Sequence, residues 1–481
     1  MRNRLGGSVT LDSIFNATSV AIAGVTPGNA GQVILDILLD FGFKGKIYPV
    51  DPKGGEVAGL QVYDEIRDVP EPLDYVISCV AAGLTPRLIN DCTTKGVKAV
   101  CILAAGFSES GTKEGRDLEK ETTRLARASG LRILGPNCLG VYSPRSGLSF
   151  SSDFPKEGGR VALICQSGGD AIYLTRAAAQ KGIRFTKVVS YGNACDIDES
   201  DLLDYFSQDP ETEIVAAYID GIKDSRRFQR VLKELSTAKP VIALKAGYIQ
   251  AGVTIVSPHA DALAGSHEIW EGLLRQSGVV CTHGLEELID MLVTFCYLRP
   301  PRGRNVAIYG GGGGFSVLAV DQFAAVGFVI PPLTQQIQEK VNQGVKDFAS
   351  SDAGFLLSNP IDVGTLMSCE GHYNILKALA TYDGLDLLVI QLSLNNSEWP
   401  QTGSAFSIWP DLVTDAIIKF HGEVNTPMAV VLHGIVSSWD LQRVLDLQVR
   451  YYEAGLPVYR SAASAAKAID RFLCYHERHP S

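Results

Sequence analysis

Short apolar runs alternate with segments of helical periodicity in the first third of the chain. The pattern predicts a helix at residues 33–41 and strands at 20–23, 47–50, 75–80, 99–103 and 131–134. Short apolar strands that alternate with helices indicate a parallel sheet with right-handed crossovers. Residues 10–145 are therefore predicted to form a Rossmann-type α/β domain.

The alternation continues in two further α/β units. In the second unit, a helix is predicted at 171–181 and apolar strands at 161–165, 214–219 and 239–247. The third unit follows Pro300-Pro301, the expected linker, and starts with a strand at 305–309 and a glycine run before a helix at 316–326. Its later strands, at 358–362, 386–392, 427–433 and 455–459, favour a flavodoxin-like sheet.

Length, charge and cysteine usage narrow the class of protein. A chain of 481 residues is long enough for about three domains of ordinary size. Its formal net charge of -10 argues against a broad surface for nucleic acid or anionic membranes. The ten cysteines stand singly, without zinc-type spacing, so no metal site is predicted. Without a signal-peptide core or an apolar run of about 18 residues, a cytoplasmic protein without membrane spans is expected.

The first strand-to-helix turn contains Gly24, Gly28 and Gly31. Glycine lets backbone amides approach an anion and a helix N-terminus favours negative charge, so this turn could bind a phosphate. The alternative is a turn that packing geometry alone requires. After the second strand, Asp51 could hold ribose hydroxyls in an NAD-dependent dehydrogenase, whereas Lys53 offers a cation for a phosphate.

The second unit places polar groups at the ends of two predicted strands. Ser167, Gly168 and Gly169 lie between its first strand and a helix, so their amides would face an anion. Asp220 follows the strand at 214–219, and ligand groups gather at the carboxyl ends of parallel strands. The alternatives are that residues 167–169 form a plain strand-to-helix turn and that Asp220 is a solvated acid at a strand end.

His259 stands in a loop of small residues just before a predicted amphipathic helix at 266–276. An accessible imidazole can act as a nucleophile, a general base or a ligand, or have no chemical role. Asp220, at a strand end, could orient this ring through one of its nitrogens.

Four motifs in the first domain resemble the CoA-binding domain of NDP-forming acyl-CoA synthetases, the relatives of succinyl-CoA synthetase. They are the turn at 24–31, Tyr48-Pro49-Val50-Asp51-Pro52-Lys53, Ala104-Ala105-Gly106-Phe107 and Gly135-Pro136-Asn137-Cys138-Leu139-Gly140. The resemblance implies that the nucleotide part of CoA is held by Gly24, Gly28, Gly31, Pro52 and Lys53. It also implies that the chain around Val80 and Gly106 lines the pantetheine arm.

The resemblance covers nearly the whole chain and implies an α-type subunit with three domains. A CoA-binding Rossmann domain is expected at 8–148. Two flavodoxin-like, succinyl-CoA ligase-like domains are expected at 156–298, with the His259 loop, and at 303–475.

In this family an acyl-CoA reacts with phosphate, the acyl phosphate phosphorylates a histidine, and the phosphohistidine passes the group to ADP or GDP. By the resemblance His259 is that histidine, Asp220 is its carboxylate partner, and Ser167, Gly168 and Gly169 face the phosphoryl group. CoA and a small carboxylic acid would be substrates. No ATP-grasp domain or Walker lysine motif is recognisable. An ATP-grasp β-type subunit, or a separate chain, is therefore expected to bind Mg²⁺ and ADP or ATP.

The chain departs from the family pattern at three positions. Asp220 stands where glutamate is usual, and Ala260 and Asp261 replace threonine and glycine after His259. A carboxylate close to a phosphoryl group in a partly buried site costs about 1 to 4 kcal/mol. A carrier or regulatory protein of the same ancestry, which binds CoA or acyl-CoA without catalysis, is therefore an open alternative. The Rossmann-type start alone also leaves an NAD-dependent dehydrogenase open.

Overall fold

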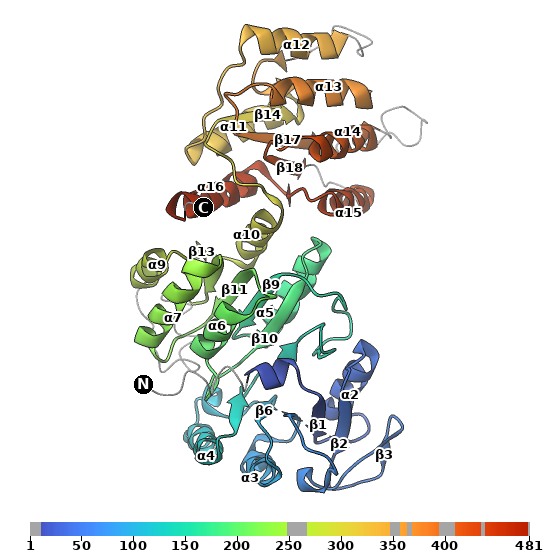
Figure 1. The fold of residues 1–481 in the computed structure, drawn as a ribbon, viewed down its shortest axis with the longest axis vertical. Helices are drawn as coiled ribbons and strands as arrows, with labels where there is room; N and C mark the ends of the chain where they lie inside the picture. Colours follow the sequence, from blue (N-terminus) through green and yellow to red (C-terminus); the bar gives the residue numbers. More distant parts are fainter. Residues whose placement is uncertain are drawn as a thin grey trace. The chain divides into compact units, whose positions relative to one another are not determined.

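A computed structural model gives the fold of the protein. It describes residues 11–247, 267–346, 356–362, 368–393, 409–433 and 438–479. The predicted α/β fold class is confirmed, because the described chain forms three mainly parallel sheets with helices between the strands (Figure 1).

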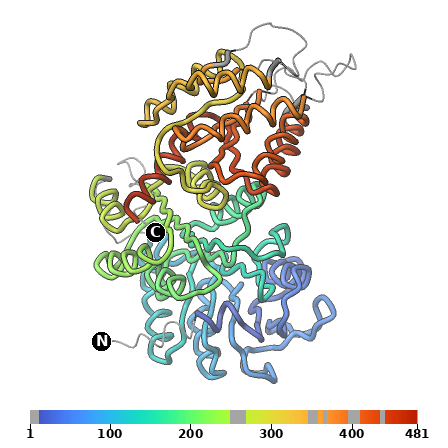
Figure 2. Tube along the Cα trace, turned by 45° about the horizontal axis from the view of Figure 1, so that its top comes forward, coloured from blue at the N-terminus to red at the C-terminus, as the bar shows by residue number. Residues whose placement is uncertain are grey.

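The chain divides into two compact units. The first consists of Met1–Ala179 and Ile183–Leu288, and the second of Gln180–Gly182 and Ile289–Ser481. Figure 2 follows the Cα trace of both units in sequence order, from blue to red. The division into three domains at 8–148, 156–298 and 303–475 stays a prediction.

The first unit begins with a sheet of five parallel strands in the order β2-β1-β5-β6-β7. Its strands are β1 (Ser19–Ala23), β2 (Lys46–Val50), β5 (Tyr75–Ser78), β6 (Ala99–Ile102) and β7 (Arg132–Leu134). The helices between them are α2 (Ala30–Phe41), α3 (Thr85–Lys95) and α4 (Lys113–Ser129). A small antiparallel pair, β3 (Glu56–Val57) and β4 (Leu60–Gln61), follows β2.

The apolar pattern of β1 explains why helices cover both faces of this sheet. Val20 and Ile22 belong to the same buried cluster as Leu35 of α2. Ala21 belongs to a second cluster, which contains Ile89 of α3. Because successive side chains of a strand point to opposite faces, a strand that is apolar throughout must be covered on both.

The second sheet of the first unit has six strands in the order β13-β12-β11-β9-β10-β8. They are β8 (Gly140–Tyr142), β9 (Val161–Cys165), β10 (Phe185–Ser190), β11 (Ile214–Ile219), β12 (Val241–Lys245) and β13 (Val280–Thr282). All of them pair in parallel except β8, which pairs antiparallel with β10. The accompanying helices are α5 (Gly168–Gln180), α6 (Glu199–Gln208), α7 (Ser225–Ala238) and α9 (His267–Gln276), and α10 (Leu285–Tyr297) follows β13.

The second unit contains the third sheet, in the order β15-β16-β14-β17-β18-β19. Its strands are β14 (Val306–Gly310), β15 (Leu356–Leu357), β16 (Ile361–Asp362), β17 (Leu387–Ser393), β18 (Met428–His433) and β19 (Val458–Tyr459). Its helices are α11 (Gly312–Ala325), α12 (Gln335–Lys346), α13 (Cys369–Ala380), α14 (Trp409–Glu423), α15 (Ser438–Glu453) and α16 (Ala462–Arg478). Among the described helices, none is long and apolar enough to cross a membrane.

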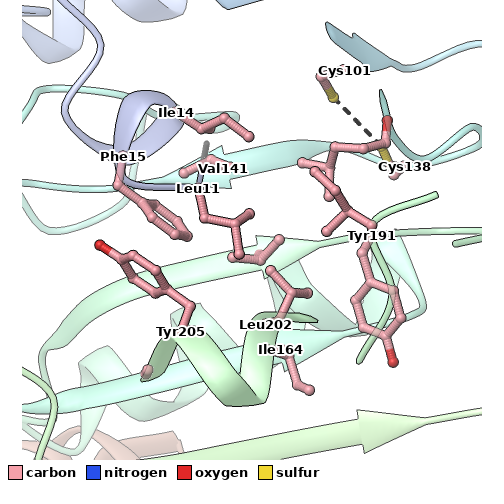
Figure 3. Packing of buried hydrophobic residues seen from close by; sticks show 14 of the residues in the cluster. Leu11, Ile14, Phe15, Cys101, Cys138, Val141, Ile164, Tyr191, Leu202 and Tyr205 are labelled. Atoms are coloured by element: carbon pink, nitrogen blue, oxygen red, sulfur yellow. Dashed lines mark hydrogen bonds between the residues drawn. The ribbon is translucent and has the colours of Figure 1, made fainter. Parts of the chain in front are cut away.

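One apolar cluster joins the two sheets of the first unit. Phe15, just before β1, packs against Tyr205 of α6 with ring centroids 4.8 Å apart (Figure 3). The same cluster contains Ile22 of the first sheet and Ile164 of the second. Because both sheets bury apolar surface in it, the hydrophobic effect holds them together as one body.

A buried ion pair lies beside this cluster, between β10 and the segment that follows α6. The Nζ of Lys187 on β10 lies 2.8 Å from Asp209 Oδ2, and the two side chains are 4% and 5% exposed. Glu211 Oε2 lies 3.1 Å from the same ammonium, and Thr212 donates a hydrogen bond to Asp209. Burial alone would raise the pKa of Asp209, but the hydrogen bonds from Lys187 and Thr212 outweigh it and lower this pKa.

We predict that Lys187→Met lowers the free energy of unfolding by about 3 kcal/mol, because it leaves the Asp209 carboxylate buried without its cation. Since the folded-state pKa of Asp209 is lowered, the stability from the pair is present at neutral pH. It is lost as the pH falls below about 4, so the difference between variant and wild type should shrink there. Urea unfolding of the full chain at several pH values measures this.

The exposed Lys233→Met serves as the matched control and should change the free energy of unfolding by no more than about 0.5 kcal/mol. Equal effects of the two substitutions would contradict a special role for the buried pair.

Candidate active site

The residues predicted to bind CoA lie at one edge of the first sheet. Parallel strands end at the same edge, so Gly24 after β1, Lys53 after β2, Val80 after β5 and Gly106 after β6 gather there. β1 lies between β2 and β5, and such a reversal of strand order is where open α/β sheets bind ligands. A Cβ added at Gly24, which has a φ of 90°, would lie 3.2 Å from Val80 Cγ1, so these two strand ends are in contact.

The glycine turn is held in shape by its own hydrogen bonds. Gly28 N donates to Gln32 Oε1 at 2.7 Å, and Asn29 Oδ1 caps α2 by accepting from Gln32 N at 3.0 Å. A Cβ at Gly31 would lie only 2.2 Å from Gly24 O. Gly31 is thus required by packing within the turn, whereas Gly28 has open space around it in the described structure.

Pro52 and Lys53 follow β2 and are exposed. Asp51 Oδ1 accepts a hydrogen bond from Lys53 N at 3.0 Å, so the carboxylate closes this turn. One acceptor position of Asp51 is therefore used within the turn, and the side chain of Lys53 is exposed beside it.

A cavity of about 350 Å³ opens at the carboxyl edge of the second sheet. β9 lies between β10 and β11, so the strand order reverses at this point as well. The lining residues come from both sheets of the first unit: Leu103, Asn137, Cys138, Leu139, Gln166, Ser167, Gly168, Gly169, Gly192, Asn193 and Asp220. The structure thus brings together Ser167, Gly168, Gly169 and Asp220, as the sequence predicted from their places at strand ends.

Ser167, Gly168 and Gly169 form the start of α5. The helix begins at Gly168, not at residue 171 as predicted, so both glycines belong to its first turn. Ser167 Oγ accepts a hydrogen bond from Asp170 N at 3.3 Å. The first backbone N–H groups of a helix have no partner within the helix, so this end can stabilise an anion in the cavity.

Asp220 is positioned by Gln166. The Gln166 Oε1 atom accepts hydrogen bonds from Asp220 N at 2.7 Å and from Gly221 N at 3.1 Å, and so joins the ends of β9 and β11. Lys245, at the end of β12, donates from Nζ to the backbone oxygen of Asp220. Burial lowers the pKa of Lys245, and the charge of Asp220 opposes that shift only in part.

Among the cavity residues that were not predicted to have a role at the site, Gln166 and Asn193 are polar and buried. Gln166 follows β9 directly and Asn193 lies three residues after β10, each within two residues of a glycine, and that pattern was the available signal. Gln166 accepts hydrogen bonds from the backbone of Asp220 and Gly221, which are distant from it in sequence. No local sequence pattern indicates such contacts.

His259, Ala260 and Asp261 lie outside the described residues. The contact between His259 and Asp220 therefore stays a prediction, as does the effect of Asp261 on a phosphoryl group.

One group of possible metal ligands occurs among the described residues. Glu271, Cys281 and His283 bring ligand atoms within 4.8 Å of one another. His283 Nε2 lies 3.5 Å from Glu271 Oε1, and Arg275 also approaches this carboxylate. The prediction that this chain binds no metal stays a prediction.

Two family models match successive parts of the chain. A model described as a CoA binding domain matches residues 18–144. A model described as a succinyl-CoA ligase like flavodoxin domain matches residues 158–295.

Comparison with known proteins extends the similarity to the whole chain. The alpha subunit of acetate–CoA ligase [ADP-forming] I from Pyrococcus furiosus is 31% identical over 468 residues, 96% of each chain. Acetate–CoA ligase [ADP-forming] from Methanocaldococcus jannaschii is 37% identical, but the match covers 74% of this chain and only 50% of that longer protein. A solved dinucleotide forming acetyl-coenzyme A synthetase 1 from Candidatus Korarchaeum cryptofilum, in complex with phosphate and ADP, superposes with a TM-score of 0.81. It is 29% identical, and the match covers 98% of this chain and 97% of that one.

The resemblance predicted from the sequence motifs is thereby confirmed. The chain belongs to the family of ADP-forming acyl-CoA synthetase alpha subunits, which are acid–thiol ligases with a CoA-binding domain and a succinyl-CoA ligase-like domain.

Proposed function

We propose that this alpha subunit interconverts an acyl-CoA, phosphate and ADP with a carboxylic acid, CoA and ATP, through an acyl phosphate and a phosphohistidine on His259. The observation that carries the proposal is the cavity at the end of β9. It combines the N-terminus of α5 with the acid Asp220, in the same unit as the CoA-binding domain. The first unit thus offers the carboxyl edge of its first sheet for CoA and a cavity at the edge of its second sheet for an anion.

The reaction can be divided into three displacements. Phosphate oxygen attacks the thioester carbonyl carbon, and CoA leaves as the thiolate. A nitrogen of His259 then attacks the phosphorus of the acyl phosphate, and the carboxylate leaves. An oxygen of ADP attacks the phosphohistidine and frees the imidazole. The backbone N–H groups of Ser167, Gly168 and Gly169 stabilise phosphoryl charge in these steps without having to move.

Asp220 is proposed to orient the imidazole of His259 by accepting a hydrogen bond from one ring nitrogen. The other nitrogen, which carries no proton, then faces the reacting phosphorus. Its backbone is fixed from two sides, by Gln166 and by Lys245, so the carboxylate starts from a defined position although its side chain is one methylene shorter than that of glutamate. In the CoA site, Gly24, Gly28, Gly31, Pro52 and Lys53 are proposed to hold the nucleotide part. Val80 and Gly106 are proposed to line the pantetheine arm.

Nucleotide chemistry is proposed to need a partner. Half of the length of the single-chain relative from Methanocaldococcus jannaschii has no counterpart here, and the Pyrococcus furiosus relative is by name one subunit of its enzyme. An ATP-grasp β-type subunit, or a separate chain, would supply ADP or ATP and Mg²⁺. A cytoplasmic location is proposed as well, and the acyl group is a small carboxylic acid.

The first test is phosphorylation of the full chain, together with its partner subunit, by labelled ATP and Mg²⁺. We expect acid-labile, base-stable label, as a P–N bond to imidazole gives, and we expect it to disappear in His259→Ala because that variant lacks the proposed nucleophile. His283→Ala, in the same unit, is the control and should keep the label. Absence of label in the wild type alongside normal CoA binding would instead favour the carrier or regulatory alternative, and NADH binding without CoA binding would favour a dehydrogenase.

The second test concerns the N-terminus of α5. Gly169→Asp should lower kcat/KM at least about tenfold, because it adds negative charge where the phosphoryl group is proposed to lie. Gly169→Ala is the matched control: its Cβ would enter open space, and kcat/KM should stay within about threefold. Equal losses in both variants, measured by steady-state kinetics, would argue against an anion at this helix end.

The third test addresses the departure from the family pattern beside His259. Asp261→Gly should leave the phosphorylation level unchanged or raise it, because it removes a carboxylate two residues from the proposed phosphohistidine. The labelling assay described for His259→Ala measures the level. A strong loss of label would mean that Asp261 has a positive role in phosphoryl transfer.

A further inference from the structure

Three side chains that can bind a metal meet where α9 packs beside β13, the edge strand of the second sheet (Figure 1). Glu271 belongs to α9, Cys281 is the middle residue of β13, and His283 follows that strand directly. A carboxylate oxygen, the thiol sulfur and an imidazole nitrogen of these residues all lie within 4.8 Å of one another. Among the residues that the structure describes, no other group of His, Cys, Asp or Glu comes together in this way.

The alternation of side chains along β13 brings two of the three ligands to one face. Successive residues of an extended chain point to opposite faces, so residues two positions apart share a face. Burial alternates accordingly, because Val280 and Thr282 are buried whereas Cys281 and His283 are half-buried. The thiol and the imidazole are thus the two groups that this end of the strand presents outside the core.

The helix that carries Glu271 is held by the core. Trp270 stacks on Phe228 of α7 with ring centroids 5.8 Å apart, and Leu274 is buried in the apolar cluster of the first unit. The turn from α9 to β13 is short, and Val279 N closes it by donating to Leu274 O at 3.0 Å. Because helix, turn and strand are fixed in this way, the three ligand groups need little further ordering to bind an ion.

The separations of the ligand atoms suit a small transition-metal ion. Zinc lies about 2.0 to 2.3 Å from its nitrogen, oxygen and sulfur ligands, so the ligand atoms of a tetrahedral site are about 3.3 to 3.6 Å apart. His283 Nε2 and Glu271 Oε1 are 3.5 Å apart. Arg275 lies 4.0 Å from the other oxygen of this carboxylate, Oε2, and metal-binding carboxylates commonly have such a partner of their own.

The kinds of ligand atom select the class of ion. Thiolate and imidazole bind zinc and its neighbours among the first-row transition metals, whereas Mg²⁺ and Ca²⁺ take oxygen ligands. The side chains of Glu271 and His283 are 29% and 34% exposed and Cys281 is half-buried, so an ion can reach them from solvent. A zinc ion with three protein ligands takes a water molecule as its fourth.

We propose that Glu271 Oε1, Cys281 Sγ and His283 Nε2 bind one divalent ion of the zinc class, which links α9 to the end of β13. The sequence alone predicted no metal because that prediction rested on the spacing of the cysteines, and only one of these ligands is a cysteine. The ion takes no part in the proposed phosphoryl transfer. Its role is structural, since it fixes the helix that follows His259 in the chain.

The test titrates the full chain, without a histidine tag and after treatment with a chelator, with Zn²⁺ and with Co²⁺. Wild type should bind one equivalent of Zn²⁺, which an excess of Mg²⁺ does not displace, and Co²⁺ should give the near-ultraviolet absorption of a cobalt–thiolate bond. Cys281→Ser should abolish this absorption and weaken zinc binding at least about tenfold. Cys296→Ser is the matched control, because Cys296 is also half-buried but lies outside the group, and it should behave like wild type.

A second measurement follows the structural role. Zinc should raise the midpoint of thermal unfolding of wild type, because an ion that binds the folded state stabilises it, and it should not raise that of Cys281→Ser. Glu271→Gln should bind zinc more weakly than wild type does but keep the cobalt–thiolate absorption, since its sulfur ligand is intact.

The inference is overturned if wild type binds no zinc, or if Cys281→Ser binds zinc as tightly as wild type. Cobalt binding without the thiolate absorption would place the ion elsewhere and would overturn it as well. The wild-type titration decides even if a variant does not fold. Labelling of His259 tests the proposed function separately, and His283→Ala should keep its label with or without zinc.

Discussion

The candidate site depends on the apolar cluster that the two sheets of the first unit share. Phe15 and Ile22 from the first sheet's side and Ile164 and Tyr205 from the second bury their side chains in one another. This burial sets the position of the second sheet against the first. For that reason Leu103, which follows a strand of the first sheet, lines the same cavity as the residues at the start of α5.

Close backbone approach is the second condition for this geometry. At Gly31 a Cβ would lie 2.2 Å from the carbonyl oxygen of Gly24, and at Gly192 it would lie 2.2 Å from that of Pro136. No side chain fits at such distances, so glycine at these two positions allows the turn after β1 and the segment after β10 to close. Gly169, which lines the cavity, instead has open space beside it, and a group outside the chain can use that space.

Buried polar groups in the first unit fall into two kinds. Lys187 and Asp209 form a buried ion pair, and Gln166 accepts hydrogen bonds from backbone amides at the end of β11. These groups stabilise the fold and position the site, because each has its partner in the protein. The Oδ1 atom of Asn193 is of the other kind: it is buried and has no hydrogen-bond partner among the described residues.

The sequence by itself determined the α/β architecture, most of the strands of the first sheet and the family. Apolar strands such as β1 alternate with helical segments along the sequence. Each of the motifs around Gly24, Lys53 and Gly106 lies within a few consecutive residues. It also indicated Ser167 and Asp220, because groups at the carboxyl ends of parallel strands must share one edge. Only the tertiary structure decided that Gln166 holds the Asp220 backbone and that Asn193 keeps its oxygen unpaired. Those properties depend on which groups from distant segments meet in space, and hydrogen-bond satisfaction is fixed by such three-dimensional neighbours and not by spacing along the chain.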